Sequence, residues 1–374
     1  MDDTKLDADW VLIQKWLPDD LYELAKKTGF FERARGIVDL SVWLRLIFLH
    51  VAGGLSLKQA AVRGGELGIV ASLSGVALHK RLRRAEKWLT KICQHLLEAR
   101  GRYTETFEWP KKYRIRVIDA TTVQEPGSTG TDYRIHFSIR LPEMTCDHYE
   151  ITDAHGGEHL GKFKFQKDEI VLADRGYSHA NGMVPVIEAG AILVVRWSKI
   201  TLPLFDSKGN KINVLRQLSK LRLGIAREWT VHIKHQGKLY PLRMCSLKKS
   251  QAAARLARVR AMATARKKHR TLQRDNLKLH DYIVILTTLP KQEFSPYQAL
   301  DLYRGRWQVE LAFKKLKTLL KAGHVPKSSD VSARSWMQAK ILVALIIERT
   351  LHEAKIFSPW GYRCKLDLPL APRN

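Results

Sequence analysis

Apolar side chains recur at helical spacing through the first hundred residues. The windows with this spacing are 10–16, 21–28, 38–51, 55–61 and 72–97. Glycine pairs at Gly53-Gly54 and Gly64-Gly65 separate the last three windows, as helix-breaking residues do. The pattern therefore predicts a helical region over residues 1–108.

Trp109-Pro110 marks a boundary, after which apolar and polar residues alternate as they do in strands. The predicted strands are 113–118, 133–139, 145–152, 170–173 and 191–197. Short loops join the first three, which predicts an antiparallel meander. The fourth is wholly apolar, as in a central strand that is covered on both faces. Helices are expected over 157–165 and 178–189.

Residues 198–278 interrupt this pattern. Alternating segments on both sides of Gln236-Gly237 predict a hairpin over 229–246, and a basic helix follows over 250–273. The apolar run 282–288 then returns to a buried strand. Helices are predicted over 302–320 and 336–351, and the last twenty residues look irregular.

These elements predict a mixed α/β fold, with an α+β sheet domain interrupted by a β-rich and basic-helix insertion and preceded by an all-helical domain. The expected segments are a helical region over 1–108, the first part of the sheet domain over 109–197, the insertion over 198–278, the second part over 279–325, and a helical C-terminal segment over 326–374.

The charge balance indicates a polyanionic partner. The chain has 64 Lys and Arg against 37 Asp and Glu, a net charge of +27. Nucleic acid fits this balance better than a membrane does. The longest apolar run, 341–347, is also too short to span a bilayer. The four cysteines are scattered without a CxxC pair, which favours free thiols in a reducing cytoplasm.

Two basic stretches are candidate DNA contacts. The helices predicted at 55–61 and 72–97 resemble a helix-turn-helix, which would present Lys80, Arg81 and Arg84 to DNA. An ordinary helical bundle has the same pattern. The basic helix over 250–273 has no acid until Asp275, so phosphate contact is favoured there over a solvated charged face.

Two aspartates, Asp119 and Asp174, each follow an apolar predicted strand. One such aspartate is commonly only a helix cap or a turn former. Both together lie where open sheets bind ligands, in the crevice at the carboxyl ends of strands.

The helix predicted over 302–320 supplies a third acid. It is introduced by Ser295-Pro296, a helix N-cap followed by proline at the first helical position. At 100° per residue Tyr303, Arg306, Glu310 and Lys317 fall within about 60° of one another, beside an apolar stripe. A solvated face with i,i+4 ion pairs is the alternative interpretation. Three converging carboxylates would repel one another without a cation, and oxygen ligands alone suit Mg²⁺ or Mn²⁺.

A rival motif, His155-Gly156-Gly157-Glu158-His159, matches the zinc-peptidase pattern H-x-x-E-H. That chemistry needs both histidines on one helical face, and two central glycines disfavour a helix. A turn after the third strand is the prediction.

Taken together, these residues resemble the DDE insertion-sequence transposases of the IS-four type. The hallmark of that family is Y-x2-R-x3-E-x6-K, which Tyr303, Arg306, Glu310 and Lys317 satisfy. The segments 117–120, 155–158 and 173–177 are also similar to the family's text around its acids. The resemblance implies an RNase H-like catalytic domain with an insertion, a helical DNA-binding N-terminal region, and a homodimer acting on paired DNA ends.

The resemblance also implies a mechanism. Asp119, Asp174 and Glu310 would hold two Mg²⁺ ions, with Mn²⁺ as a substitute, while Tyr303, Arg306 and Lys317 contact the DNA end. Trp307 would either stack on an unpaired base or pack on the sheet. The expected function is cleavage at the terminal inverted repeats of an insertion sequence and joining of the 3′-OH ends to target DNA, in the bacterial cytoplasm at the nucleoid. The alternatives are a Mg²⁺-dependent nuclease that does not join strands, and an inactive basic DNA-binding protein.

Overall fold

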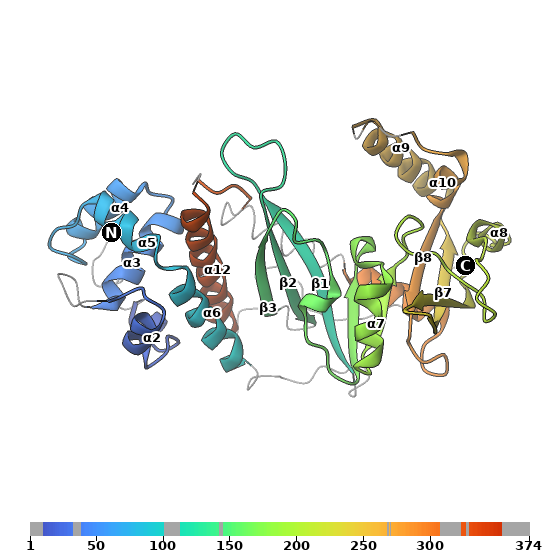
Figure 1. Cartoon of the computed structure of the whole chain (residues 1–374), viewed down its shortest axis with the longest axis horizontal. Coiled ribbons are helices and arrows are strands. Elements are labelled where there is room, and N and C mark those ends of the chain that lie inside the picture. Colours follow the sequence, from blue (N-terminus) through green and yellow to red (C-terminus); the bar gives the residue numbers. More distant parts are fainter. Residues whose placement is uncertain are drawn as a thin grey trace.

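The computed structural model describes residues 10–32, 39–100, 113–141, 145–267, 269, 271–306, 323–326 and 329–353. A helical unit lies at one end, a twisted sheet in the middle, and the insertion at the other end (Figure 1). No helix within these ranges is long and apolar enough to cross a membrane.

The helical unit combines both ends of the described chain. Its elements are a helix at residues 10–14, α2 (Leu21–Lys27), α3 (Leu40–Val51), α4 (Leu57–Glu66), α5 (Gly75–Leu82), α6 (Glu86–Arg100) and α12 (Asp330–Glu353). Trp88 of α6 stacks on Phe30 with ring centroids 4.1 Å apart, and Trp336 and Leu342 of α12 are buried in the same core. The C-terminal helix therefore completes the apolar core that the N-terminal helices begin.

Two details of the predicted N-terminal helices are wrong. Gly64-Gly65 does not break the chain, because α4 begins at a capping box formed by Ser56 and Gln59 and runs through both glycines to Glu66. Gly64 lies where α4 packs against α3, and a Cβ there would stand 2.3 Å from Leu46 Cδ2. Gly65 faces solvent. Gly64 is thus a packing residue rather than a helix breaker.

The helix predicted over 72–97 is two helices. The backbone tightens after α5, where the N–H groups of Arg84 and Ala85 donate to the carbonyls of Arg81 and Leu82. Such i→i+3 bonds end an α-helix. Ala85 at this corner is fully buried, so α6 leaves in a direction that packs Trp88 into the core.

One eight-stranded sheet forms the centre, in the order β3-β2-β1-β4-β5-β8-β7-β6. Its strands are β1 (Arg114–Val123), β2 (Tyr133–Leu141), β3 (Thr145–Asp153), β4 (Glu169–Ala173), β5 (Ile192–Arg196), β6 (Arg227–His235), β7 (Lys238–Lys248) and β8 (Tyr282–Thr287). The predicted meander is confirmed, since β1, β2 and β3 pair antiparallel. Both β1 and β5 run parallel to β4, so the sheet is mixed, and the predicted fold class is confirmed.

Helices cover both faces of this sheet, which explains the wholly apolar β4. Val171 and Ala173 point into a core shared with α7 (Ala180–Glu188). Ile170 and Leu172 point into a second core that includes Leu300 and Tyr303 of the helix at residues 296–306. A strand covered on both faces buries every side chain, so its sequence does not alternate.

The insertion extends the same sheet. Gln236 (φ 46°) and Gly237 (φ 80°) form the predicted hairpin turn between β6 and β7, and β7 then pairs with β8. The insertion also carries α8 (Val214–Leu218), α9 (Gln251–Lys267) and α10 (Arg274–Leu279). Above β8, α9 and α10 project from the sheet (Figure 1).

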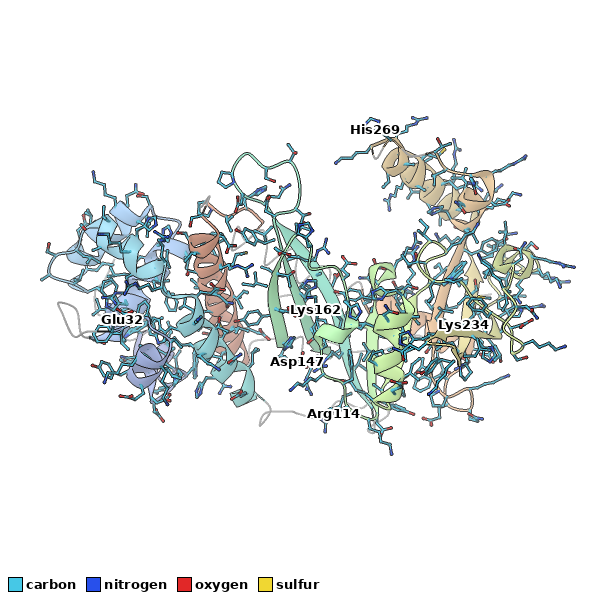
Figure 2. All side chains as sticks on the ribbon, viewed as in Figure 1. Glu32, Arg114, Asp147, Lys162, Lys234 and His269 are labelled. Carbon is cyan, nitrogen blue, oxygen red and sulfur yellow. The ribbon has the colours of Figure 1, made fainter. Side chains whose placement is uncertain are left out.

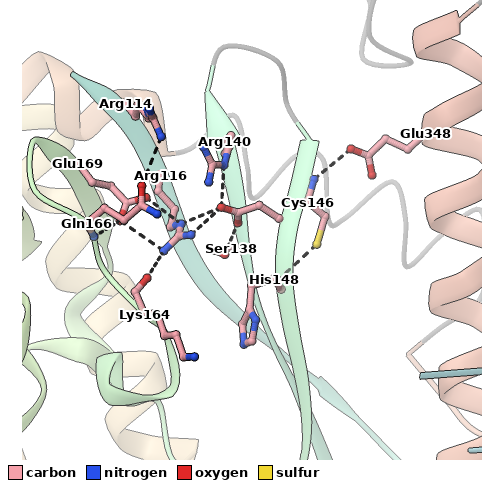
Figure 3. A network of polar contacts seen from close by, with 11 residues as sticks. Arg114, Arg116, Ser138, Arg140, Cys146, His148, Lys164, Gln166, Glu169 and Glu348 are labelled. Carbon is pink, nitrogen blue, oxygen red and sulfur yellow. Dashed lines mark hydrogen bonds and ion pairs between the residues drawn. The ribbon is translucent and has the colours of Figure 1, made fainter. Parts of the chain in front are cut away.

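A buried ion network fastens the meander to β4 (Figure 3). Asp147 of β3 accepts from Arg116 of β1 at 2.7 Å and from Arg140 of β2 at 2.9 Å. Arg116 also lies 3.3 Å from Glu169 of β4. Buried charges persist only when they are paired and hydrogen-bonded, as these are. Next to Asp147, the Cys146 N–H donates to Glu348 of α12 at 3.0 Å, which ties the sheet to the helical unit.

Candidate active site

Asp119 and Asp174 lie side by side on neighbouring strands. The parallel ladder between β1 and β4 pairs Ile118 with Ala173, so the next residue on each strand is one of the two aspartates. The expectation that Asp119 ends its strand is wrong in one respect. β1 continues to Val123, because it stays paired with β2 after its ladder with β4 has ended. The acids therefore lie at the point where two strands separate, which is where a sheet opens a crevice.

The helix at residues 296–306 brings two further predicted residues to the acids. Its start is fixed as expected, since Ser295 and Gln298 exchange hydrogen bonds between side chain and backbone. The Tyr303 hydroxyl donates to Asp174 Oδ1 at 3.0 Å. The Arg306 guanidinium lies 3.9 Å from a carboxylate oxygen of each of Asp119 and Asp174.

The surroundings keep Asp174 ionised. Burial raises the pKa of this carboxyl group. The opposing effects of Arg306, the backbone N–H of Arg175 and the Tyr303 hydroxyl are larger in sum, so its pKa lies below its usual range. Burial, followed by the charge of Asp174, raises the pKa of Tyr303, so the hydroxyl stays protonated and able to donate.

The two acids suit a hard cation. Their side chains remain 22% and 38% exposed, so an ion can reach two carboxylates that lie at one level of the sheet. Within the described ranges no group of three His, Cys, Asp or Glu side chains is close enough to hold a metal. Glu310, the predicted third ligand, lies outside those ranges, as do Trp307 and Lys317. The guanidinium of Arg306 supplies positive charge next to both acids.

Comparison with known proteins agrees with this geometry. The family model described as "Transposase DDE domain" matches residues 110–346, more than half of the chain. The chain belongs to the DDE transposases. It is 31% identical over 350 residues to the transposase InsL of insertion sequence element IS186A from Escherichia coli K12, covering 91% of this chain and 93% of the relative. The transposase of insertion sequence element IS421 from Escherichia coli has the same identity and coverage.

One solved structure is similar to this chain in fold. The piggyBac transposase in a synaptic complex with hairpin DNA superposes with a TM-score of 0.50 at 10% sequence identity, over 92% of this chain and 76% of that one. The RNase H-like fold is thereby confirmed. The family model and the two insertion-sequence relatives confirm the predicted function, DNA transposition by an enzyme that cleaves and transfers DNA strands.

The N-terminal candidates of this transposase differ in what they contact. Arg81 turns inward, where its guanidinium donates to the Phe30 carbonyl at 2.7 Å and lies 5.0 Å from the Trp43 ring centroid. Lys80 is exposed, and Arg84 forms an exposed ion pair with Glu32 at 3.2 Å. Lys80 and Arg84 are therefore better placed than Arg81 for a ligand in solution.

The zinc-like motif of the transposase is a turn, as predicted. The N–H groups of His155 and Gly156 donate to the Asp153 carboxylate, directly after β3. Only a 3₁₀ turn, η1 (Leu160–Lys162), occupies the region predicted as a helix over 157–165. His159 Nδ1 accepts from the Gly161 N–H at 2.9 Å, so that ring nitrogen caps a turn and is not available to a metal.

Glu158, which was not among the predicted site residues, lies close to Asp174. Its carboxylate lies against the turn that follows Asp174, where a Cβ on Gly176 would stand 1.4 Å from Glu158 Oε2. Burial raises the pKa of Glu158, and Asp174 acts in the same direction. The glycine after Asp174-Arg175 was the available signal, since it leaves room for a side chain from a distant segment.

Proposed function

We propose that Asp119 and Asp174, together with Glu310, are the catalytic carboxylates of this transposase and hold Mg²⁺, with Mn²⁺ as a substitute. The observation that carries the proposal is the pairing of both aspartates across the end of the β1–β4 ladder, beneath Tyr303 and Arg306. When bound, divalent ions in such sites activate the attacking oxygen and stabilise the leaving oxygen.

The remaining side chains position groups. Tyr303 fixes the rotamer of Asp174 through a partly buried hydrogen bond, so the carboxylate is oriented before substrate arrives. Arg306 neutralises the acid pair and presents donors to a scissile phosphate. Lys317 would contact the DNA end, and Trp307 would stack on an unpaired base beside it.

The substrate in this proposal is double-stranded DNA. The terminal inverted repeats of an insertion sequence would be cut and then joined to target DNA by a homodimer, in the bacterial cytoplasm at the nucleoid. Support comes from the net charge of +27 and from relatives named as insertion-sequence transposases. The structural relative solved with hairpin DNA agrees. Lys80 and Arg84 would contact the same DNA through the helical unit.

The test uses two labelled duplexes from the DNA that borders the gene, one intact and one already cut to expose the 3′-OH. Incubation with Mg²⁺ and a plasmid is expected to cut the first and to join the second to the plasmid. A nuclease that does not transfer strands would cut the intact duplex and leave the pre-cut one unjoined. Binding without either product would indicate an inactive DNA-binding protein.

A further inference from the structure

Three basic side chains near the ends of three strands lie close to one another, and two of them lie next to Asp174. β4 pairs Ala173 with Val195 of β5, so Arg196 lies level with Asp174, and Arg175 follows Asp174 directly. β8 runs antiparallel to β5, and β7 antiparallel to β8, so β7 ends on the same edge of the sheet as β4 and β5. Lys249 is the first residue after β7. We call Arg175, Arg196 and Lys249 the basic triad.

The fold holds the triad in place. The Lys249 N–H donates to the Asp281 carbonyl at 2.9 Å, and Lys249 Nζ donates to the His280 carbonyl at 2.8 Å. Arg196 is the last residue of a strand paired on both sides. Two of the three bases are therefore anchored by backbone geometry, unlike a solvated charge run whose side chains spread apart.

Asp174 is an acid that acts on both arginines of the triad, and its charge is shared with Arg306. Neither guanidinium of the triad makes a side-chain hydrogen bond or an ion pair within the part of the chain that the structure describes. The charge of Asp281 raises the pKa of Lys249, but the Asp281 carboxylate is already paired with Arg258 at 2.9 Å. Burial, and then the charges of Arg196 and Arg175, lower the pKa of Lys249 to about 8. Holding like charges together costs free energy that an anionic ligand would offset.

The location of the triad beside the acid pair indicates which anion it binds. Successive phosphates of a DNA strand lie several ångströms apart, so a strand whose scissile phosphate is at Asp119 and Asp174 must place a neighbouring phosphate close by. Past Lys249 the chain enters α9, which has five basic and no acidic residues and whose side chains point outward above this edge (Figure 2). An acidic protein could also neutralise the positive charge of the triad, but nothing about the acid pair would bring an acidic protein to this position.

We propose that the basic triad is a phosphate-binding subsite, which holds the DNA backbone one or two nucleotides from the scissile bond and directs that strand toward α9. The inference rests on the proposed function, since it requires DNA at the acid pair. It assigns a role to residues outside the Tyr303-Arg306-Glu310-Lys317 signature.

The test compares two double variants of the full-length protein that remove equal charge. Arg196→Gln with Lys249→Gln changes the triad, and Arg114→Gln with Lys234→Gln changes exposed bases at the start of β1 and the end of β6, on the opposite edge. Binding of a duplex from the gene's border is measured against salt concentration in EDTA, so that cutting does not contribute. The triad variant is expected to lose roughly two units of the salt slope, and more than the control variant loses.

Phosphate-ethylation interference then locates the contact. On the wild type, ethylation of one or two phosphates next to the cut should block binding, and in the triad variant this interference should disappear. The charge-keeping variant Arg196→Lys with Lys249→Arg should restore both the slope and the interference, which separates charge from folding. Equal slopes and an unchanged interference pattern in the triad variant would overturn the subsite. A triad variant that binds DNA normally but no longer binds an acidic protein would also overturn the subsite. A wild type that binds DNA but neither cuts nor joins it would refute the proposed function alone.

Discussion

At the scale of single residues, burial decides which charged and polar groups are structural and which face a ligand. His136 on β2 is fully buried, and its Nε2 lies 3.0 Å from both Thr152 Oγ1 and the Gly156 carbonyl. Burial is the main reason that its pKa falls to about 4 from the ordinary 6.5, and Lys162 adds to the effect. Asp119 and Asp174, by contrast, keep part of their surface open.

His136 should make the fold sensitive to acid. The unfolded chain binds a proton near pH 6.5 and the folded chain only near pH 4, so stability is complete above pH 6.5 and falls as pH drops toward 4. The full loss is about 3 kcal/mol. Urea unfolding at pH 7 and pH 4.5 should show most of this loss in the wild type and much less of it in His136→Gln. His95→Gln, an exposed site on α6, serves as the control, and an identical pH dependence in all three proteins would contradict the assignment.

Single residues also show how much of the site could be predicted from the sequence. Tyr303 and Arg306 were found from spacing, and the structure brings both to the predicted acids. Arg196 and Lys249 were missed, because strand pairing across the insertion brings them near Asp174 and no local spacing encodes that pairing. Arg81 and Lys80 are adjacent basic residues of the same predicted helix, so the sequence does not distinguish them. The aromatic pocket around Arg81 does.

At the scale of elements, most helices and strands were predictable because their apolar faces repeat with the right period. The errors occur where one side chain meets a partner far away in the sequence. The glycines of α4 are the clearest case, because Gly64 packs against Leu46 of α3, whereas the nearest atom to a Cβ on Gly65 would be the Val70 carbonyl oxygen at 3.8 Å.

These neighbouring glycines should respond oppositely to alanine. Gly64→Ala would overpack the contact between α3 and α4 and is expected to destabilise the protein by about 1–3 kcal/mol. Gly65→Ala has room and is expected to stabilise the exposed helix interior by roughly 0.5–1 kcal/mol. Thermal unfolding of the two variants provides the comparison. Equal shifts of the same sign would show that the packing of α4 on α3 is misplaced.

At the scale of the whole molecule, one core joins chain segments that are more than 200 residues apart. Trp336, Met337, Leu342 and Leu345 of α12 are buried among the N-terminal helices. Periodicity along the chain predicted α12 as a helix but could not place it, because periodicity contains no information about which faces meet.

A fragment of residues 1–108 should therefore fail to fold cooperatively. Without α12 its central helices expose the face that Trp336 and Leu342 cover, and the apolar area buried would be too small for stability. Circular dichroism should show a broad thermal transition, which should become sharp on adding a peptide of residues 329–353. A sharp transition in the fragment alone would mean that the N-terminal helices form an independent domain.

The central claim is that the paired aspartates at the end of the β1–β4 ladder carry out DNA cleavage. The most direct test measures Mg²⁺-dependent cutting of the bordering duplex by Asp119→Asn and Asp174→Asn. Asp275→Asn, which changes an exposed acid paired with Lys278, is the control. Each of the first two variants should lose roughly 10²–10³-fold or more of the cutting rate, with DNA binding retained, while the control cuts normally. Cutting at the wild-type rate by either active-site variant would contradict the account.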